Sequence, residues 1–419
     1  MRNRQSIITN IDWLTIVLYF MLVLFGWINV YASVYNEEHS SIFDFSQRYG
    51  KQLIWILASV VILLIILLID AKFFSTFAYP IYFIGIIVLV SVLVFGKEIA
   101  GSRSWFQIGS FSLQPSEFTK ITVSLALAKY LSTFNISLKN IKHIIRAFAI
   151  ILLPVLLVFL QNDTGSALVY FALILVLYRE GLSGNLLLLG VIITMLFIFS
   201  LLFDNIYVII GISVIGIAFL FFINRTLPNI LRLVLILVIA SAFVLSVDYA
   251  FNNFLSSHQK KRINVVLGKD MDIRGAGYNV HQSKIAIGSG GIWGKGFLKG
   301  TQTKYNFVPE QDTDFIFCTV GEEFGFIGSF FLIALYAVFL IRLIAISERQ
   351  KSKFVRIYGY SVVSILFFHF FINIGMTIGI IPVIGIPLPF ISYGGSSLWA
   401  FTILLFIFLR QDANRTQIL

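Results

Sequence analysis

Residues Ile54–Ile69 read IWILASVVILLIILLI and contain no charged side chain. A second run without charge covers Phe77–Phe95. A helix needs about 20 apolar residues to cross roughly 30 Å of hydrocarbon, and inside lipid it satisfies every backbone polar group within the segment. A transmembrane β-barrel would instead show alternating strands of about ten residues, which this sequence lacks. The sequence therefore predicts an all-α polytopic membrane protein.

The composition of the whole chain agrees with a membrane location. Of the 419 residues, 58% are hydrophobic and only 12% are charged, and soluble domains cannot hide that much apolar side chain. The net charge of +11 would suggest nucleic acid in a soluble protein. Basic loops that face anionic lipid, with an anionic substrate as a further reason, explain it better here, so no nucleic-acid partner is expected. A single cysteine, Cys318, excludes an intramolecular disulfide.

About twelve blocks are long and apolar enough to be interpreted as membrane-spanning helices. Their approximate cores are residues 11–32, 52–69, 77–95, 115–132, 144–160, 164–178, 186–203, 206–223, 229–251, 314–342, 357–380 and 394–409. The first block is too long for the apolar part of a signal peptide and is expected to remain as a span. Lysine and arginine concentrate in the loops of one side, whereas Ser33–Gly50 on the other side contains Glu37, Glu38 and Asp44. The positive-inside rule then predicts cytoplasmic N- and C-termini in the cytoplasmic (inner) membrane.

One loop differs from the others. Residues 252–313 form a long, glycine-rich segment that this orientation places on the extracytoplasmic side, and long structured loops in compact proteins are usually functional. Its first part is basic at Lys260, Lys261 and Arg262, which suits either a segment at the surface of an anionic membrane or ordinary flanking charges. Because no soluble domain or clear repeat is present, residues 1–419 are predicted to form a single membrane domain.

Asp314 is the first of several ionisable residues that fall near or within the predicted spans, where charge is costly and usually functional. Pro309 ends the long loop, and Asp312 or Thr313 could cap the following helix, which would place Asp314 in its first turn. A partly buried carboxylate there could act as a general base, while the alternative is that it only caps the helix. The residues themselves leave both interpretations open.

A second cluster lies in Gln114–Lys120, which begins a predicted helix with a proline. Glu117 and Lys120 are spaced i, i+3, so they share a helix face and can pair. Such a pair is either a buried structural bridge or part of a polar cavity. The preceding Arg103 favours the cavity, because it adds a cation from the adjacent loop.

Three further segments carry weaker signals. Asp163 lies in a tight external turn, where it either caps the next span or helps to hold a cation or orient another residue. The glycine-rich run Ile287–Gly296 contains Lys295 and could let the backbone approach an anion, but it matches neither a Walker A loop nor GxGxxG. Tyr393–Ser397 looks like a flexible turn before the last helix. The five histidines are scattered and predict no metal cluster.

Taken in order, these motifs resemble the SEDS family of peptidoglycan glycosyltransferases. The matching segments are Gly101–Arg103, Gln114–Lys120, Asp163–Gly165, Gly275–Tyr278, Gln282–Gly291, Gly294–Phe297, Thr313–Phe317, Glu322–Gly325 and Pro387–Ser396. They extend over nearly the whole chain, and Gly300–Gln302 favours the elongation branch of the family over its division branch. The family fold implies a helical bundle of ten spans, so the two additional spans in residues 206–251 would be an insertion that leaves the long loop outside. Asn162 and Ser104 depart from residues that are common in the family.

The resemblance also implies a function and roles for these residues. The family polymerises lipid II into glycan strands on the outer face of the membrane, and it displaces undecaprenyl diphosphate with inversion. Asp314 would be the general base. The other implied contacts are Arg103, Lys284 and Lys295 toward the diphosphate, and Glu117, Lys120, Asp163, Gln282 and Ser283 along the substrate cavity. A divalent cation, Mg²⁺ or Mn²⁺, could assist, although no ligand cluster in the sequence demands one.

A partner is implied in the same way. Members of the family work with a separate class B penicillin-binding protein, a transpeptidase that crosslinks the new strand, and this chain has no such domain. Three other functions stay open on the sequence: a transporter that flips lipid II without joining it, a scaffold, and the division-specific role within the same family. Covalent product in a single-component assay separates polymerisation from translocation.

Overall fold

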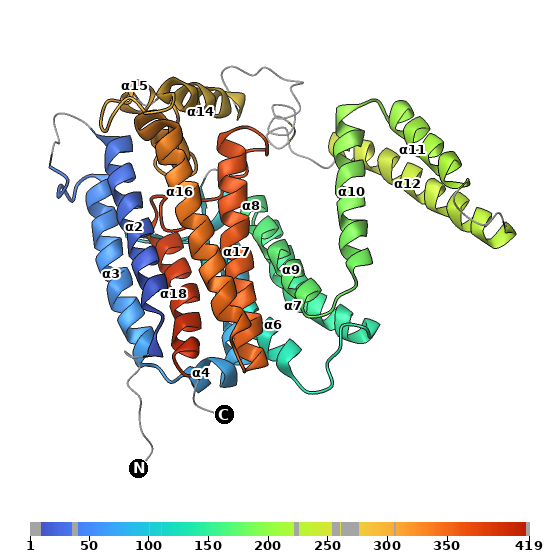
Figure 1. The fold of residues 1–419 in the computed structure, drawn as a ribbon, viewed down its shortest axis with the longest axis horizontal. Coiled ribbons are helices and arrows are strands. Elements are labelled where there is room, and N and C mark those ends of the chain that lie inside the picture. The colour runs from blue at the N-terminus through green and yellow to red at the C-terminus, as the bar shows by residue number, and fades with distance from the viewer. Residues whose placement is uncertain are drawn as a thin grey trace, which may run out of the picture. The chain divides into compact units, whose positions relative to one another are not determined.

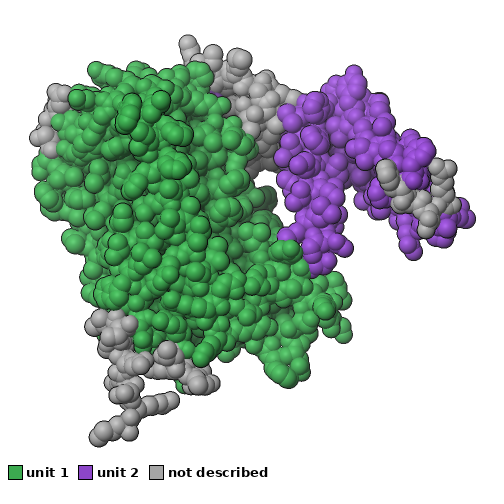
Figure 2. All heavy atoms as spheres, in the orientation of Figure 1, with its two compact units in different colours: residues 1–182, 279–419 green, residues 183–278 purple. Residues whose placement is uncertain are grey.

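The computed structural model describes residues 10–35, 41–99, 101–109, 111–221, 226–253, 260, 276–305 and 307–415. The chain forms two compact units, one from residues 1–182 and 279–419 and the other from residues 183–278 (Figure 2). Apart from Lys260, the basic stretch 260–267 at the start of the long loop lies outside the described residues.

The first unit is a helical bundle (Figure 1). Its helices are α2 (Trp13–Val34), α3 (Arg48–Leu68), α4 (Ala71–Thr76), α5 (Ala78–Phe95), α6 (Pro115–Ser132), α7 (Ile141–Leu160), α8 (Thr164–Val169), η2 (Tyr170–Ala172), α9 (Leu173–Arg179), α14 (Ala276–Gly290, from residue 279 on), α15 (Thr301–Lys304), α16 (Ile316–Glu348), α17 (Lys353–Thr377) and α18 (Gly395–Asp412). A small antiparallel sheet joins α5 to α6, with strand order β1 (Lys97–Ile99), β2 (Ser102–Ile108) and β3 (Phe111–Leu113).

The second unit contains three further helices. They are α10 (Gly184–Leu202), α11 (Asn205–Phe219) and α12 (Leu227–Asn253). Ser200 of α10 donates its hydroxyl to the carbonyl of Val244 in α12 at 3.1 Å, and Gly216 of α11 lies against the side chain of Leu237. The predicted additional spans in residues 206–251 therefore correspond to α11 and α12.

Many of the long helices turn a large apolar face outward. In α3, for example, Leu57, Leu64 and Leu68 are exposed by 59%, 54% and 82%. Such a surface is a liability in water and is expected when the solvent is lipid. Eight helices within the described ranges are long and apolar enough to cross a membrane. Of the residues in the most apolar stretch of each helix, 72% are buried in α17 but only 11% in α10. Helix α17 therefore lies at the centre of the first unit.

The predicted spans agree with the helices that form. Each of the twelve blocks coincides with a helix or, for residues 164–178, with the sequence from α8 to α9. Helices α6 and α18 bury polar side chains, while α11 and the α8–α9 segment are shorter than the eight apolar helices. The all-α, multi-pass architecture is thus confirmed, and the exact number of crossings stays a prediction.

Helix α16 is broken at Gly325, whose backbone angles (φ 62°, ψ −156°) are not helical. The break leaves backbone groups without helical partners, and the glycine-rich loop supplies them. The backbone N–H of Phe326 donates to the carbonyl of Gly291 at 2.9 Å, and that of Lys295 donates to the carbonyl of Glu322 at 3.0 Å. The break in α16 and the docking of the loop are therefore one structural feature.

Replacing Gly325 by alanine is expected to destabilise the protein by about 2 kcal/mol or more. Backbone conformations reserved for glycine cost other residues about 1–3 kcal/mol, and a Cβ at this position would lie 2.3 Å from the Gly294 nitrogen. Thermal unfolding of the purified protein in detergent measures the effect. Gly288→Ala is the matched control, because a Cβ there meets no atom within 4 Å. Equal unfolding temperatures for both variants would contradict the coupling of break and loop.

The chain between α17 and α18, residues 378–394, is not helical and runs into the interior of the bundle; we call it the α17–α18 connection. Phe390 and Ile391 pack against Gly26 of α2, where a Cβ would lie 2.6 Å from the Ile391 Cα. Non-helical backbone at such depth is tolerated only where protein surrounds it and pairs its polar groups. Tyr336 of α16 provides one such partner by donating its hydroxyl to the carbonyl of Pro389.

The end of this connection corrects one sequence-based expectation. Tyr393–Ser397 was predicted to be a flexible turn, but its backbone is held at several points. The N–H of Tyr393 donates to the carbonyl of Asp312 at 2.8 Å, and the N–H of Gly394 donates to Gln52 Oε1 at 3.2 Å. Contacts from remote parts of the chain fix this segment, and no local sequence pattern could reveal them.

Candidate active site

Asp314 lies half-buried in the turn that precedes α16. The helix begins at Ile316 with Phe315 at its N-cap position, so Asp314 comes before the helix. The sequence-based prediction, which placed Asp314 in the first turn of the helix, is therefore wrong. The expected cap, Asp312, is engaged elsewhere: both of its carboxylate oxygens accept from Arg48 Nη1 at 2.7 Å. The turn is therefore shaped by an ion pair with α3.

The α17–α18 connection forms one wall beside Asp314. Asn373 of α17 donates from Nδ2 to two carbonyls, those of Asp314 and Ile386, each at 2.8 Å. At Gly385 (φ 68°) a Cβ would lie 3.3 Å from Asp314 Oδ2. The carboxylate thus faces a glycine in the connection, and a single amide side chain fixes both backbones.

Besides its ion pair with α3, the turn that carries Asp314 is anchored to two other parts of the first unit. Gln311 donates from Nε2 to the carbonyls of Ser33 at 2.6 Å and Thr303 at 2.8 Å, which links the turn to α2 and α15. Arg48 also lies 5.9 Å from the centre of the Tyr393 ring. These anchors hold the backbone around the carboxylate in one conformation.

The predicted pair of Glu117 and Lys120 is present and deeply buried. Lys120 Nζ lies 2.8 Å from Glu117 Oε1, and the two residues are exposed by only 1% and 3%. Lys120 Nζ also lies 2.8 Å from His369 Nε2 of α17 and 5.4 Å from the centre of the Phe401 ring. Of the two alternatives left open by the sequence, the geometry is that of a buried ion pair, extended by a histidine.

Asp163 caps α8 and also bonds beyond that helix. Its Oδ1 accepts from the backbone N–H of Ser166 at 3.0 Å, and its Oδ2 accepts from Gln114 Nε2 at 2.8 Å. Two residues later, Gly165 lies against the α17–α18 connection, since a Cβ there would be 2.3 Å from the Ile384 carbonyl oxygen. The start of α8 and Asp314 thus lie against neighbouring residues of the same connection.

Lys295 is held inside the glycine-rich loop. Its Nζ lies 2.6 Å from Glu322 Oε1, and it donates to Thr301 Oγ1 at 2.7 Å. Glu322 is completely buried and also accepts from the backbone N–H groups of Gln302 and Thr303 at 2.8 and 2.9 Å. The carboxylate of Glu322 therefore compensates the positive charge of Lys295 and organises the start of α15.

The candidates on α14 lie beside the end of α17. Ser283 is buried and donates its hydroxyl to the carbonyl of Thr377 at 2.9 Å. Lys284 is exposed, and its Nζ would be 2.6 Å from a Cβ on Gly379, at the start of the α17–α18 connection. Gln282 is half-buried on the same helix. The structure therefore joins α14 to the α17–α18 connection, which also faces Asp314.

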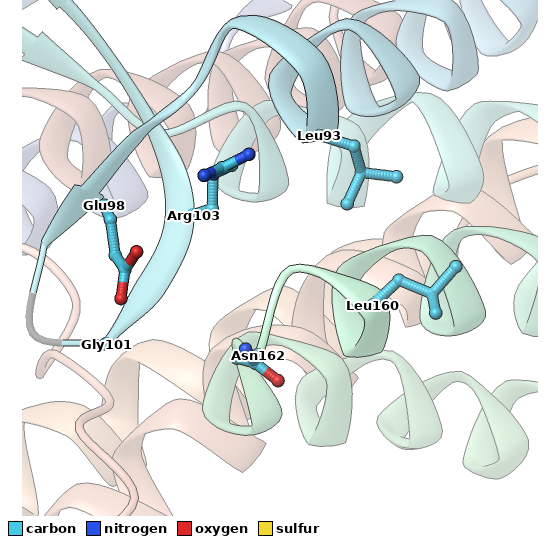
Figure 3. A pocket seen from close by; sticks show the side chains of 6 residues that line it. All are labelled: Leu93, Glu98, Gly101, Arg103, Leu160 and Asn162. Carbon is cyan, nitrogen blue, oxygen red and sulfur yellow. The ribbon is translucent and has the colours of Figure 1, made fainter.

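Arg103 lies in a separate pocket at the edge of the sheet. Figure 3 shows its side chain on β2 beside Glu98, with Leu93, Leu160 and Asn162 around it. The backbone N–H of Arg103 donates to the carbonyl of Gln161 at 3.0 Å, which ties β2 to the turn before α8. Arg103 is exposed in this pocket and is accessible to an anionic group.

Sequence reasoning missed three residues of this site. His369 and Asn373 lie among several other polar residues of α17 with no spacing that marks them, and Arg48 was passed over although it is a cation in an acidic loop predicted outside. That exception to the positive-inside pattern was the one usable signal. Among the described residues, no group of three or more His, Cys, Asp and Glu is arranged to hold a metal ion.

Comparison with known proteins gives consistent matches over most of the chain. A family model described as a cell cycle protein, FtsW/RodA/SpoVE, matches residues 12–210 and 181–417. The peptidoglycan glycosyltransferase RodA of Treponema pallidum (strain Nichols) is 32% identical over 419 residues, 94% of this chain and 95% of that protein. The peptidoglycan glycosyltransferase MrdB of Escherichia coli (strain K12) is 36% identical over 340 residues, 81% of this chain and 78% of that protein. Among solved structures, one similar chain comes from work on the structural coordination of polymerization and crosslinking by a peptidoglycan synthase complex. It is 26% identical to this chain, and the TM-score is 0.72. The match covers 97% of this chain and 99% of that chain.

Proposed function

This chain belongs to the FtsW/RodA/SpoVE (SEDS) family, and we propose that it is a peptidoglycan glycosyltransferase of the elongation branch that polymerises lipid II, with Asp314 as the general base. The observation that carries this proposal is the position of Asp314. Its half-buried carboxylate faces Gly385, and Asn373 and the Asp312–Arg48 pair fix the surrounding backbone. A base must be held in place to act on one particular hydroxyl, and this one is.

In the proposed reaction, the 4-hydroxyl of an acceptor sugar attacks the anomeric carbon of the donor. Its proton passes to the carboxylate of Asp314 while the new glycosidic bond forms. The bond from the anomeric carbon to the diphosphate oxygen breaks, and the electron pair leaves with undecaprenyl diphosphate. Attack from the face opposite the leaving group inverts the anomeric configuration. A base on one side and positive charge on the other are the two requirements of this step.

Two cations are suited to the leaving diphosphate. Lys284 is exposed beside Gly379, and Arg103 is exposed in the pocket beside Asn162. We assign Lys284 the contact near the reacting atoms and Arg103 a contact nearer the membrane boundary. Lys295, the third candidate, would act there through the loop that its pair with Glu322 holds in shape. Gln282 and Ser283 would line the site from α14.

The remaining predicted residues would shape the site from the elements that support the α17–α18 connection. Glu117 and Lys120 form a buried pair under the α17–α18 connection, and Asp163 joins the start of α8 to Gln114. The pair is too deeply buried to contact a sugar directly, since both residues are at most 3% exposed. Their proposed role is to hold the wall of the site. A divalent cation, Mg²⁺ or Mn²⁺, would serve the diphosphate as a counterion in addition to the lysine.

We place the site on the extracytoplasmic side of the membrane. Figure 1 shows α14 and α15 at one end of the first unit and α4 at the other. The α16–α17 junction, at the opposite end of these helices from Asp314, carries Arg349, Lys351 and Lys353, which the positive-inside rule assigns to the cytoplasm. Both termini would then be cytoplasmic. On this view the chain is one SEDS domain to which α11 and α12 are an addition.

A separate transpeptidase of the class B penicillin-binding protein type is the partner that we propose. Peptidoglycan needs crosslinks as well as glycan strands, and the similar solved chain belongs to a complex that coordinates the two. The extracytoplasmic surface of α14 and α15 is a part of this chain that such a partner could reach. Membrane lipids would surround the exposed apolar helix faces.

Polymerisation is tested with purified protein in lipid vesicles that contain fluorescent lipid II, with and without a class B penicillin-binding protein. We expect glycan chains of many lengths on a gel in the presence of the partner. Translocation of lipid II across the vesicle membrane without any glycan product would favour a flippase instead. Neither product nor translocation, with the partner bound, would favour a scaffold.

A further inference from the structure

His369 of α17 is buried, with only 1% of its surface exposed. Its Nε2 lies 2.8 Å from Lys120 Nζ, and its Nδ1 lies 3.1 Å from the carbonyl oxygen of Pro387. The imidazole packs against the Phe401 ring in a T-shaped arrangement, with centroids 4.8 Å apart and planes at 84°. The ring is thus fixed on three sides, between the buried ion pair and the α17–α18 connection.

The partners determine which imidazole nitrogen carries the proton. A lysine ammonium can only donate, so Nε2 must offer its lone pair to Lys120. The proton of a neutral imidazole is then on Nδ1, where it is donated to the carbonyl of Pro387. The hydrogen bonds therefore run in one direction, from the ammonium to the imidazole and from the imidazole to the connection. Because a buried carbonyl needs a partner, loss of this donor would leave Pro387 O unsatisfied.

The connection continues from Pro387 to the wall of the proposed active site. Asn373 is one helical turn after His369 on the same face of α17, and it donates to Ile386 O at 2.8 Å. Two successive carbonyls of the connection are therefore held by two residues of α17. The preceding residue, Gly385, is the one that Asp314 Oδ2 faces. A shift of the carbonyl at Pro387 would be transmitted over two residues to that wall.

We propose that His369 is a positioning residue for the glycosyltransfer step: it holds the α17–α18 connection through Pro387 and so fixes the wall that Asp314 faces. The inference rests on the proposed function of Asp314. It assigns the buried pair of Glu117 and Lys120 a purpose, since the pair orients the imidazole so that Nδ1 donates to the connection. His369 itself is fully enclosed and would not touch the substrate.

Two substitutions separate the two hydrogen bonds of the imidazole. The amide of asparagine can take the place of Nδ1, so His369→Asn keeps a donor for Pro387 and loses the acceptor for Lys120. The longer glutamine can place its carbonyl near Nε2, so His369→Gln keeps the acceptor for Lys120 and loses the donor to Pro387. We expect His369→Gln to lower kcat about 100-fold with little change in KM, as a misplacement of about 1 Å would do, and His369→Asn to stay within about tenfold of the unchanged protein.

Hydrogen–deuterium exchange of the full chain provides a readout that does not depend on activity. Peptides covering residues 383–392 should exchange faster in His369→Gln than in His369→Asn, because only the former loses the bond to the connection. This measurement still tests the inference if the unchanged protein makes no glycan and the proposed function fails. If His369→Gln does not fold, His369→Asn is compared with His369→Ala. The alanine variant also lacks the acceptor for Lys120, but it has no donor for the carbonyl of Pro387.

The order of the variants in exchange rate and in kcat decides whether the proposal stands. Faster exchange and lower kcat in the variant without the Pro387 donor support the proposal. Equal exchange and equal kcat in the asparagine variant and its comparison variant would overturn it. A higher kcat in His369→Gln than in His369→Asn would also overturn it, because the histidine would then serve Lys120 and not the connection.

Discussion

Asp314→Asn is expected to abolish glycan polymerisation while the protein still folds and inserts into the membrane. Asparagine has nearly the same shape as aspartate but cannot accept the proton of the attacking hydroxyl. Loss of a general base lowers a rate by about 10²–10⁴-fold, which would take the product below detection in a gel assay. The hydrogen bond from Asn373 Nδ2 to the backbone carbonyl of residue 314 does not involve the side chain of residue 314, so the fold should be retained.

The measurement is glycan product from purified protein and lipid II, with a class B penicillin-binding protein present. Asp204→Asn is the matched control, since it makes the same chemical change at an exposed residue before α11. That variant should make product at the normal rate. Equal thermal unfolding of all three proteins would show that they are folded. Near-normal product from Asp314→Asn would remove Asp314 from the role of base.

The parts of this site that could be predicted from the sequence are those set by local spacing. The uncharged run Ile54–Ile69 predicted membrane helices, and α3 covers most of it. The i, i+3 spacing of Glu117 and Lys120 predicted their pairing, because that spacing brings side chains together on any helix. Asp163 was correctly considered as a helix cap, since a cap is also a local contact.

The parts that were missed depend on contacts between remote segments. His369 meets Lys120 across 249 residues of sequence, and Arg48 meets Asp312 across 264. A histidine within an apolar helix gives no hint of its partner, because its hydrogen bonds are set by tertiary packing. For the same reason Asp314 was placed in the first turn of α16: the competition of Arg48 for Asp312 could not be foreseen.

The bounds of the α17–α18 connection could be predicted, because it falls between the predicted spans 357–380 and 394–409, but its path through the interior of the bundle could not. Its residues 381–391 are mostly apolar, so hydropathy alone does not say whether they lie in lipid or within the protein. What makes the segment irregular is its three prolines, Pro382, Pro387 and Pro389, which lack the N–H that a helix needs. What makes it stable at depth is the set of donors on the surrounding helices, among them Asn373 and His369. That arrangement turns a break in the helical pattern into the wall of a site.

Substitutions in the buried pair of Glu117 and Lys120 are expected to separate the structural role of the pair from its role in catalysis. Glu117→Gln leaves the ammonium of Lys120 without its carboxylate, and Lys120→Met leaves a buried carboxylate without its cation. Removing one member of a buried ion pair costs about 3–5 kcal/mol, because an uncompensated charge remains. Both single variants should therefore unfold at lower temperature and make little or no glycan.

The double exchange, Glu117→Lys with Lys120→Glu, restores one positive and one negative charge at the same spacing. We expect it to recover most of the lost stability and more glycan product than either single variant. Recovery of product should nevertheless be incomplete, because the carboxylate placed at position 120 can only accept a hydrogen bond. His369 must then donate from Nε2, and a neutral imidazole would have no proton left on Nδ1 for the carbonyl of Pro387.

Unfolding temperature and glycan product, measured on the same preparations, distinguish the outcomes. Restored stability with partly restored product supports a pair that acts through His369 on the connection. Restored stability with fully normal product would mean that the direction of the hydrogen bonds through His369 is irrelevant to catalysis. If neither quantity recovers, the two residues have separate roles that depend on the sign of each charge, and the idea that they act as a pair is wrong.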